Sequence, residues 1–238
     1  MPMTPRPRVA AIIPVLDEEG AIGPVVGAIP RDWVDEILVV DGGSKDRTIA
    51  EAEAAGARAV IETRRGYGRA CAAGAEAAQS EILVFLDGDG SDRPELIPEL
   101  LAPLLAGTHD FVIASRTLGR REKGSMGMHQ VWAGLVIGWA VGILSGVRYT
   151  DMCAFRAISA DTLRRLDMRE MTYGWNLEMQ MRAARTGLRI LEIPVAYRCR
   201  IAGQSKVAGT LRGSLKAGSR ILRTLVKVAR ESAANSVR

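Results

Sequence analysis

The chain has 238 residues, of which 47% are hydrophobic and 25% are charged, and its formal net charge is +5. This composition is ordinary for a globular protein, and the length suffices for one domain with a large core and an appendage. The isolated cysteines Cys71, Cys153 and Cys199 argue against a disulfide framework or a structural zinc site, and they fit a reducing compartment. The positive charge favours anionic partners such as phosphates, nucleotides or anionic lipid.

Two apolar stretches bear on membrane insertion. Residues 1–14 lack the layout of a signal peptide, because their apolar run is short and leads into a predicted strand. Val131–Val147 is the most apolar stretch, but it is slightly shorter than a usual span and contains four glycines. We therefore expect a cytoplasmic protein that can also lie peripherally on the inner face of the cell membrane.

Strands and helices alternate through the first half of the chain. Predicted strands at 8–13, 36–40, 57–62, 82–86 and 110–115 are separated by helices that end near residues 28, 55 and 79 and by one that follows residue 92. Ser44 or Asp46 can cap the second of these helices, and Ser91 or Asp92 can cap the fourth. The alternation predicts an α/β fold with a doubly wound, mostly parallel sheet.

The fourth predicted strand, Ile82–Leu86, is a continuous apolar run that ends in Asp87-Gly88-Asp89. Such a run is typical of a strand buried on both faces. Two carboxylates at its end suit Mg²⁺ or Mn²⁺ held together with the phosphates of a substrate. An acidic turn is the alternative. A calcium loop of the EF-hand type is excluded, because Asp92 stands where glycine is required and Pro98 where glutamate is required.

Charged residues follow other predicted strands as well. Asp17 and Glu18 follow the first strand, Asp41 ends the second, and Arg116 follows the fifth. The carboxyl ends of parallel strands lie at one edge of a sheet, where open α/β folds bind their ligands. Each residue alone could be a capping or turn residue. Together they predict a cleft with acids for ribose hydroxyls and metal and a base for phosphate.

After residue 116 the pattern changes. Residues 117–127 are predicted as a mobile loop, 131–147 as an apolar helix, 153–158 as a strand, 160–166 and 176–186 as helices, and a last strand lies within 188–200. Gly66-Tyr67-Gly68 does not fit the dinucleotide fingerprint, which would follow the first strand. It either lets a loop approach the nucleotide or simply opens a helix.

Residues 206–238 are predicted as a basic amphipathic helix. One face carries Arg212, Lys216, Arg220, Arg223, Lys227 and Arg230, and the other carries Leu211, Leu215, Leu222, Leu225 and Val226. Such a helix either binds an anionic membrane surface or packs its apolar side on the domain. No nucleic-acid partner is predicted, because few aromatic residues accompany the basic ones.

The order of these motifs resembles family 2 glycosyltransferases of the GT-A fold, in the branch of the dolichyl-phosphate mannose synthases. The resemblance covers residues 8–206, and it rests on 14–18, 41–46, 66–68, 87–89, 115–116, 150–151 with 155–156, Glu178 and 203–206. The chain departs from the family at Asp17, where asparagine is usual, and at Ser91, where the mannose synthases can have a glutamine metal ligand. The third metal ligand is therefore open.

The resemblance implies roles for individual residues. The nucleoside pocket would be lined by Pro14, Leu16, Glu18 and Asp41, with Ser44 and Gly68 also binding substrate. Asp89 would be the principal ligand of Mg²⁺ or Mn²⁺, with Asp87 beside it, and the donor phosphates would be held by Arg116 and Lys206. The sugar and the acceptor would lie near Asp151, Arg156 and Glu178.

The implied reaction moves a hexose from a nucleotide-diphosphate sugar to an acceptor with inversion at the anomeric carbon. The metal and Arg116 would stabilise the departing diphosphate. Asp151 would be the base for a hydroxyl acceptor, whereas a polyprenyl phosphate is already ionised and would meet basic residues such as Arg148, Arg198 or Arg200. The 117–127 loop could close over the donor.

Several alternatives stay open at this point. The acceptor could be a soluble hydroxyl compound, with the 131–147 helix pairing with its copy in a homodimer. A nucleotidyltransferase would carry a glycine-rich basic loop after the first strand, where this chain has residues 14–19. A non-catalytic nucleotide-binding adaptor would lack Asp87, Asp89 or Lys206. We expect residues 1–205 to form the catalytic domain, with 8–116 binding the nucleotide sugar and 117–205 binding the acceptor.

Overall fold

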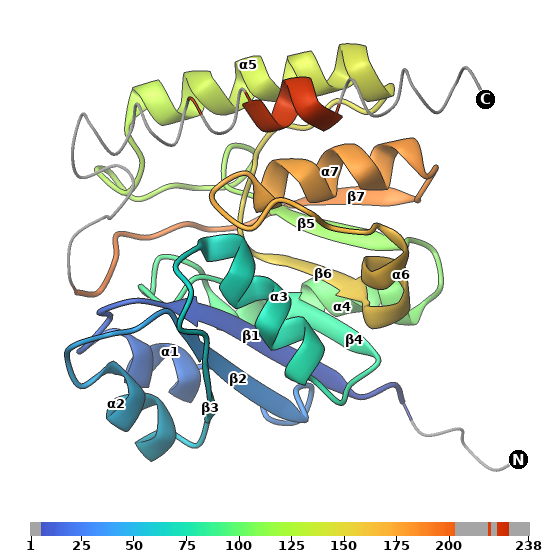
Figure 1. Cartoon of the computed structure of the whole chain (residues 1–238). Coiled ribbons are helices and arrows are strands. Elements are labelled where there is room, and N and C mark those ends of the chain that lie inside the picture. The colour runs from blue at the N-terminus through green and yellow to red at the C-terminus, as the bar shows by residue number, and fades with distance from the viewer. Residues whose placement is uncertain (1–5, 203–218, 220–222, 229–238) are drawn as a thin grey trace, which may run out of the picture.

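The computed structural model describes residues 6–202, 219 and 223–228, which form a three-layer α/β molecule (Figure 1). The elements are, in chain order, β1 (Val9–Val15), α1 (Ile22–Gly27), β2 (Glu36–Asp41), α2 (Thr48–Ala54), β3 (Arg58–Ile61), α3 (Tyr67–Ala77), β4 (Ile82–Phe85), the 3₁₀ turn η1 (Pro94–Leu96), α4 (Ile97–Leu105), β5 (Phe111–Ser115), α5 (Met128–Ser145), β6 (Arg156–Ser159), α6 (Ala160–Arg165), α7 (Trp175–Arg185) and β7 (Ile190–Pro194).

The sheet has seven strands in the order β3-β2-β1-β4-β6-β5-β7 within the described part of the chain. Only β6 runs against its neighbours there, between β4 and β5, and the remaining pairs are parallel. The predicted mostly parallel sheet is confirmed. Because β1, β2, β4 and β5 all point the same way, their carboxyl ends share one edge. The segment before β6 enters the sheet at that same edge.

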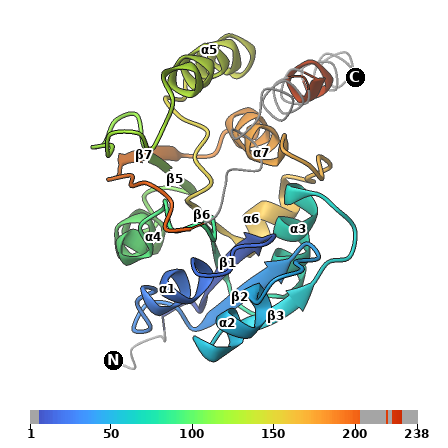
Figure 2. The same cartoon turned by 90° about the vertical axis from the view of Figure 1, so that its left-hand side faces the viewer.

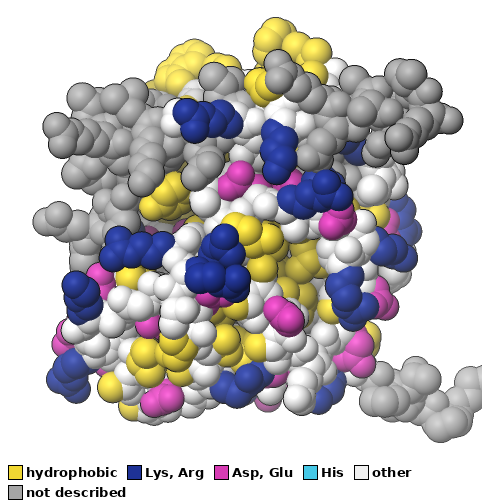
Figure 3. Space-filling view, in the orientation of Figure 1, with side chains coloured by type: hydrophobic (Ala, Val, Ile, Leu, Met, Phe, Trp, Pro, Cys, Tyr) yellow, Lys and Arg dark blue, Asp and Glu magenta, His cyan; other side chains and the backbone are white. Residues whose placement is uncertain are grey.

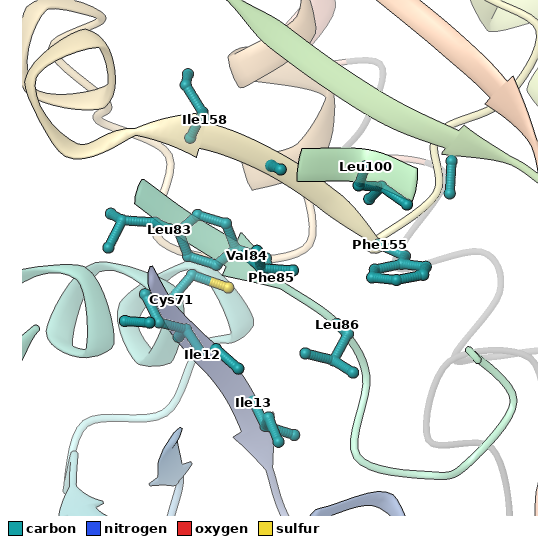
Figure 4. Packing of buried hydrophobic residues seen from close by; sticks show 14 of the residues in the cluster. Ile12, Ile13, Cys71, Leu83, Val84, Phe85, Leu86, Leu100, Phe155 and Ile158 are labelled. Carbon is teal, nitrogen blue, oxygen red and sulfur yellow. The ribbon is translucent and has the colours of Figure 1, made fainter. Parts of the chain in front are cut away.

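Helices cover both faces of the sheet (Figure 2). α1, α2 and α4 lie on one face, and α3, α6 and α7 lie on the other. The buried strands supply a continuous apolar core, in which Ile12 of β1 is in register with Phe85 of β4 and lies beside Cys71 of α3 (Figure 4). α3 is rich in alanine because it packs tightly on the sheet: a Cβ at Gly74 would collide with Ile12 and Val40.

The predicted helix caps need correction. Arg47, not Ser44 or Asp46, is the residue before α2, although the Asp46 carboxylate does accept a bond from the Thr48 N–H at 3.0 Å. Neither Ser91 nor Asp92 caps the fourth helix, because η1 starts only after Arg93. The side chains of Ser91 and Asp92 instead form hydrogen bonds within the turn that follows β4.

Residues 223–228 form a turn of helix at the same end of the molecule as α5 (Figures 1 and 2). Arg223 and Lys227 are exposed, and Thr224 and Val228 are buried against the domain. This short part therefore packs on the protein, as in the second alternative above, although Val226 is exposed rather than on the packed side. The other residues of the predicted basic helix lie outside the described residues. No helix in the described ranges is long and apolar enough to cross a bilayer.

Candidate active site

Three carboxyl groups gather in the turn that follows β4. Asp87 is half-buried, and Asp89 and Asp92 are buried. The Asp92 carboxylate accepts a bond from the Asp87 N–H at 3.0 Å, which shapes the turn. Burial raises the pKa of Asp87 well above its usual range, and the charges of Asp92 and Asp89 raise it further. Burial likewise raises the pKa of Asp92, to about 6. Burial and mutual repulsion thus disfavour the ionised forms of these carboxyl groups, and a bound cation would relieve that repulsion.

Asp89 is held through both of its carboxylate oxygens. Oδ1 accepts bonds from the N–H of Ser91 at 2.8 Å and from its hydroxyl at 2.6 Å. Oδ2 accepts a bond from Nη2 of Arg200 at 2.6 Å. Ser91 thus contacts the principal predicted metal ligand, at the position where the family varies. Arg200 was predicted to meet an acceptor phosphate, and in this structure it pairs with Asp89.

The loops after β1 and β2 are tied to each other at the same edge. Asp41 is buried and accepts bonds from the N–H groups of Gly43 and Ser44, at 3.0 Å and 3.0–3.1 Å, and from the Ser44 hydroxyl. The Ser44 hydroxyl in turn accepts a bond from the Asp17 N–H at 2.8 Å. Glu18 is buried beside them, and the Glu18 N–H donates to the Thr48 hydroxyl at 2.8 Å. The predicted nucleoside-pocket residues of these loops therefore come together.

Pro14 and Leu16 belong to the same edge. Pro14 is half-buried within β1, paired with Val40 of β2, and Leu16 is half-buried just after β1 ends. Both therefore keep some exposed apolar surface at this edge of the sheet. Such a surface can contact the flat face of a nucleobase.

The half-buried Arg116 and the buried Asp151 form an ion pair beside the β4 turn. Nε and Nη2 of Arg116 donate to the two Asp151 oxygens at 2.8 and 2.7 Å, and the Arg116 N–H donates to Asp151 at 2.9 Å. The guanidinium also lies over the ring of Tyr197 at 5.0 Å from its centroid. Burial on its own would raise the pKa of Asp151, but the bonds and charge of Arg116 outweigh it and lower that pKa.

Gly68 allows the main chain of another protein segment to approach closely. A Cβ at Gly68 would lie 2.8 Å from the carbonyl carbon of Met171, and a Cβ at Gly66 would collide with the Met171 oxygen. The Gly68 N–H donates to the Thr172 oxygen at 3.3 Å. The two glycines thus let the loop before α7 pass over the start of α3. Between them, the Tyr67 hydroxyl lies 3.4 Å from Asp87, so this tyrosine is a site residue that the sequence analysis missed.

Arg156 and Glu178 lie behind the site and hold it together. The Arg156 guanidinium is fully buried and donates to the main-chain oxygens of Cys153, Ala154 and Asn176. Glu178 is also buried, and it accepts bonds from the N–H groups of residues 169 and 170 at 2.9 and 2.6 Å. Both side chains therefore position the loops around the site, and their predicted place near the sugar and the acceptor stays a prediction.

Asp92 joins the site from a position where sequence analysis saw only a cap. Asp92 lies five residues after Asp87, and the turn brings its carboxylate back to the Asp87 N–H.

Lys206, the second predicted phosphate-binding residue, lies outside the described residues. No set of three or more His, Cys, Asp or Glu side chains in the described part is arranged to hold a metal ion. Two carboxylates at a strand end nevertheless suit Mg²⁺ or Mn²⁺, which complete their shell with substrate phosphates.

This fold and this acidic strand end agree with the comparisons to known proteins. The model of "Glycosyl transferase family 2" matches residues 10–163. The chain belongs to this family, and it is a glycosyltransferase with the GT-A fold. The nucleotidyltransferase and the non-catalytic adaptor are therefore set aside.

Named relatives and solved structures support this assignment. The chain is 36% identical to an undecaprenyl-phosphate mannosyltransferase of Micrococcus luteus, over 87% of this chain and 90% of that protein. It is 31% identical to a dolichyl-phosphate hexose transferase of Haloferax volcanii, over 93% and 94%. Glucosyl-3-phosphoglycerate synthase of Mycobacterium tuberculosis, solved with phosphoglyceric acid, superposes with a TM-score of 0.74 at 26% identity, over 94% of this chain and 80% of that one. The same enzyme solved with Mn²⁺, UDP-glucose and glycerol 3-phosphate gives a TM-score of 0.74 at 24% identity, over the same shares.

Proposed function

We propose that this glycosyltransferase moves a hexose from a nucleotide-diphosphate sugar to a polyprenyl phosphate at a membrane surface, with inversion of the anomeric carbon. The observation that carries the lipid acceptor is an exposed apolar face on α5, close in sequence to the site. Two relatives named for undecaprenyl-phosphate and dolichyl-phosphate transfer support the same acceptor.

The donor would lie across the carboxyl edge of the sheet. The loops around Asp41 and Ser44 offer bonding groups for the nucleoside, and the β4 turn offers Asp87 and Asp89 for the metal. Bound Mg²⁺ or Mn²⁺ would supply positive charge for the diphosphate leaving group. The acidic turn fits such an ion, and Mn²⁺ with UDP-glucose is bound in the structural neighbour of the same fold.

The acceptor oxygen would attack the anomeric carbon while the bond from that carbon to the diphosphate breaks. A hydroxyl acceptor must lose a proton in this step, and Asp151 is the predicted base. Asp151 instead accepts three hydrogen bonds from Arg116, and its lowered pKa makes it a weaker base. A phosphate acceptor is already ionised and requires no base. The ion pair would then serve to place the sugar and to present the Arg116 charge.

α5 offers a surface for the lipid. Met128, Trp132, Val136, Trp139 and Ile143 recur at helical spacing and are each between 59% and 69% exposed, and we call this set the α5 stripe. Apolar side chains protrude at this end of the molecule (Figure 3). Exposed basic residues flank the helix: Arg120, Arg121, Lys123 and Arg148. An apolar stripe with two tryptophans and basic flanks suits the interface of an anionic membrane.

The helix also returns the chain to the site. A Cβ at Gly138 of α5 would collide with the Tyr149 oxygen, and the Thr150 hydroxyl bonds to that of Ser115 at 2.7 Å. Asp151 follows at once. A lipid seated on the α5 stripe would therefore have its phosphate near Arg148 and the Arg116–Asp151 pair.

Donor and acceptor panels test this proposal. The full chain is incubated with Mn²⁺ or Mg²⁺, UDP- and GDP-sugars, and either a short polyprenyl phosphate or phosphoglyceric acid, the ligand of the structural neighbour. Sugar transfer that requires the polyprenyl phosphate would support the proposal and identify the sugar. Transfer to phosphoglyceric acid or another soluble acceptor alone would overturn the lipid acceptor, and no transfer from any donor would overturn the proposal as a whole.

A further inference from the structure

One segment lies across the acidic edge of the sheet. Residues 197–202, which we call the strap, follow β7 and are bonded along both sides. The Tyr197 N–H donates to the Arg120 oxygen at 2.9 Å, the Arg198 N–H to the Ser91 oxygen at 3.3 Å, and the Ile201 N–H to the Asp89 oxygen at 2.9 Å. The strap is thus anchored directly on the turn that carries the predicted metal ligands.

Side chains of the strap fit this turn closely. Gly90 has a φ of +78°, and a Cβ there would collide with the Ile201 side chain. Nε of Arg198 donates to the Gly90 oxygen at 2.7 Å. Ala202 lies 3.6 Å from where a Cβ of Gly20 would be, so the strap also reaches the loop after β1. Its position is set by packing and bonds on several sides, which fixes where Arg200 lies.

Arg200 places its charge on Asp89. Nη2 lies 2.6 Å from Oδ2 of Asp89, while Oδ1 already accepts two bonds from Ser91. Both oxygens of this carboxylate are therefore occupied by protein donors. A metal ion that used the Oδ2 oxygen would have to displace the guanidinium, because two cations cannot share that site without strong repulsion.

The second terminal nitrogen of Arg200 is not satisfied. Nη1 is buried and has no hydrogen-bond partner among the described residues. A buried donor without an acceptor destabilises the protein, and it does so more strongly when it belongs to a charged group. The unpaired Nη1 and the paired Nη2 belong to one planar guanidinium group, a geometry that suits two oxygens of a phosphate. The site therefore contains a cationic group with an unused donor next to the proposed metal position.

We propose that Arg200 is a substitute cation for the metal and a ligand of the donor diphosphate. Without substrate, Arg200 neutralises Asp89 and keeps metal affinity low. When the metal and the nucleotide arrive together, Arg200 leaves Asp89 and donates from both terminal nitrogens to the diphosphate. Metal and nucleotide thus bind cooperatively. This inference rests on the proposed function, since it assumes that a metal–diphosphate binds at the β4 turn.

Calorimetric titration of Mn²⁺ into the full chain, with and without UDP, tests the inference independently of turnover. Relative to the unsubstituted chain, Arg200→Gln should bind Mn²⁺ alone about tenfold more tightly and should bind UDP at saturating Mn²⁺ about tenfold more weakly, within the usual range of coupling between sites. Arg198→Gln is the matched control, because it removes the same charge from a position two residues away. Among the described residues, the Arg198 side chain hydrogen-bonds only to a main-chain oxygen, that of Gly90. It should leave affinity for Mn²⁺ alone within about twofold.

Arg200→Lys keeps the charge but loses the planar guanidinium group with its two terminal nitrogens. This variant should therefore retain weak Mn²⁺ binding and still lose UDP affinity. This variant tests the inference even if Arg200→Gln does not fold. Unchanged Mn²⁺ affinity in Arg200→Gln, or an equal gain in Mn²⁺ affinity in Arg198→Gln, would overturn the inference. The proposed function would still stand if the unsubstituted chain transferred sugar. If the unsubstituted chain bound no Mn²⁺ with UDP and transferred no sugar, both would be overturned.

Discussion

The carboxylates at the carboxyl edge differ in their partners, and the partners decide what each group can do. Asp41 is fixed by the backbone of its own loop, Asp151 by the Arg116 fork, and Asp89 by Ser91 and Arg200. Among these, Asp89 combines a position in the turn after β4 with a cationic partner, Arg200, that we propose is exchanged for the metal. We therefore expect Asp89 to be the most sensitive position for catalysis.

Asp89→Asn should lower kcat by about 100-fold or more, since the electrostatic stabilisation of a departing diphosphate is commonly of this size. The measurement is release of nucleotide and of glycosylated acceptor at saturating donor. Glu95→Gln is the control, because Glu95 is an exposed carboxylate nearby that pairs with Arg93 on the surface. Equal activity of the two variants would contradict a metal-binding role for Asp89.

Asp151→Asn should destabilise the fold as well as slow the reaction. Removing one partner of a buried ion pair leaves the other charge uncompensated and typically costs about 3–5 kcal/mol. Urea unfolding measures this free energy. Asp161→Asn, which breaks an exposed pair with Arg164, should change it by less than about 0.5 kcal/mol. Matching values for the two variants would show that the buried pair does not hold the site.

The same pair predicts a pH dependence. Arg116 lowers the pKa of Asp151 in the folded state, so its contribution to stability is present above the unfolded pKa and is lost as pH falls through the folded pKa. The difference in unfolding free energy between Asp151→Asn and the unsubstituted chain should therefore be largest near neutral pH and shrink in acid. A difference that grew on acidification would contradict this assignment.

At the scale of elements, α3 and the loop before α7 are fitted to each other through glycine. Gly68→Ala would force a Cβ against the backbone of Glu170 and Met171, and overpacking of this kind costs about 1–3 kcal/mol. Gly27→Ala in α1 is the control, because nothing lies within 4 Å of a Cβ there and the change should stabilise by up to about 1 kcal/mol. Thermal unfolding of both variants measures the contrast. Equal stability would mean that the loop moves aside without cost.

The sequence predicted this edge well where its chemistry is local. The strand ends and their acids follow from apolar runs that stop at Asp41 and Asp87, and parallel topology then brings them together. Partners distant in sequence were beyond such reasoning. Arg200 reaches Asp89 from 111 residues away, and Arg116 locks Asp151 from 35 residues away. The approach of Gly68 to a nucleotide stays a prediction, and only the fold shows that the backbone of residues 170–171 packs against this glycine.

At the scale of the whole molecule, one end combines apolar and basic side chains. The exposed Arg223 and Lys227 belong to the end that carries α5 and its stripe (Figure 1), where apolar side chains protrude (Figure 3). The candidate site lies at the carboxyl edge of the sheet, and Asp151 follows Ser145, the last residue of α5, by six residues. A surface docked through α5 would present a lipid phosphate to the site without a spanning helix.

Trp132→Ser with Trp139→Ser should reduce binding of the full chain to vesicles of zwitterionic and anionic lipid by about tenfold or more. Burial of one such side chain contributes about 1.5–3 kcal/mol, and each 1.4 kcal/mol is tenfold in affinity. Cosedimentation measures the binding.

Trp33→Ser is the control, since Trp33 is an exposed tryptophan that lies outside α5. Because added salt screens only the electrostatic part, the tryptophan effect should persist at high ionic strength. Unchanged vesicle binding, together with conversion of a dimer to a monomer in light scattering, would instead assign the α5 stripe to a second copy of the chain.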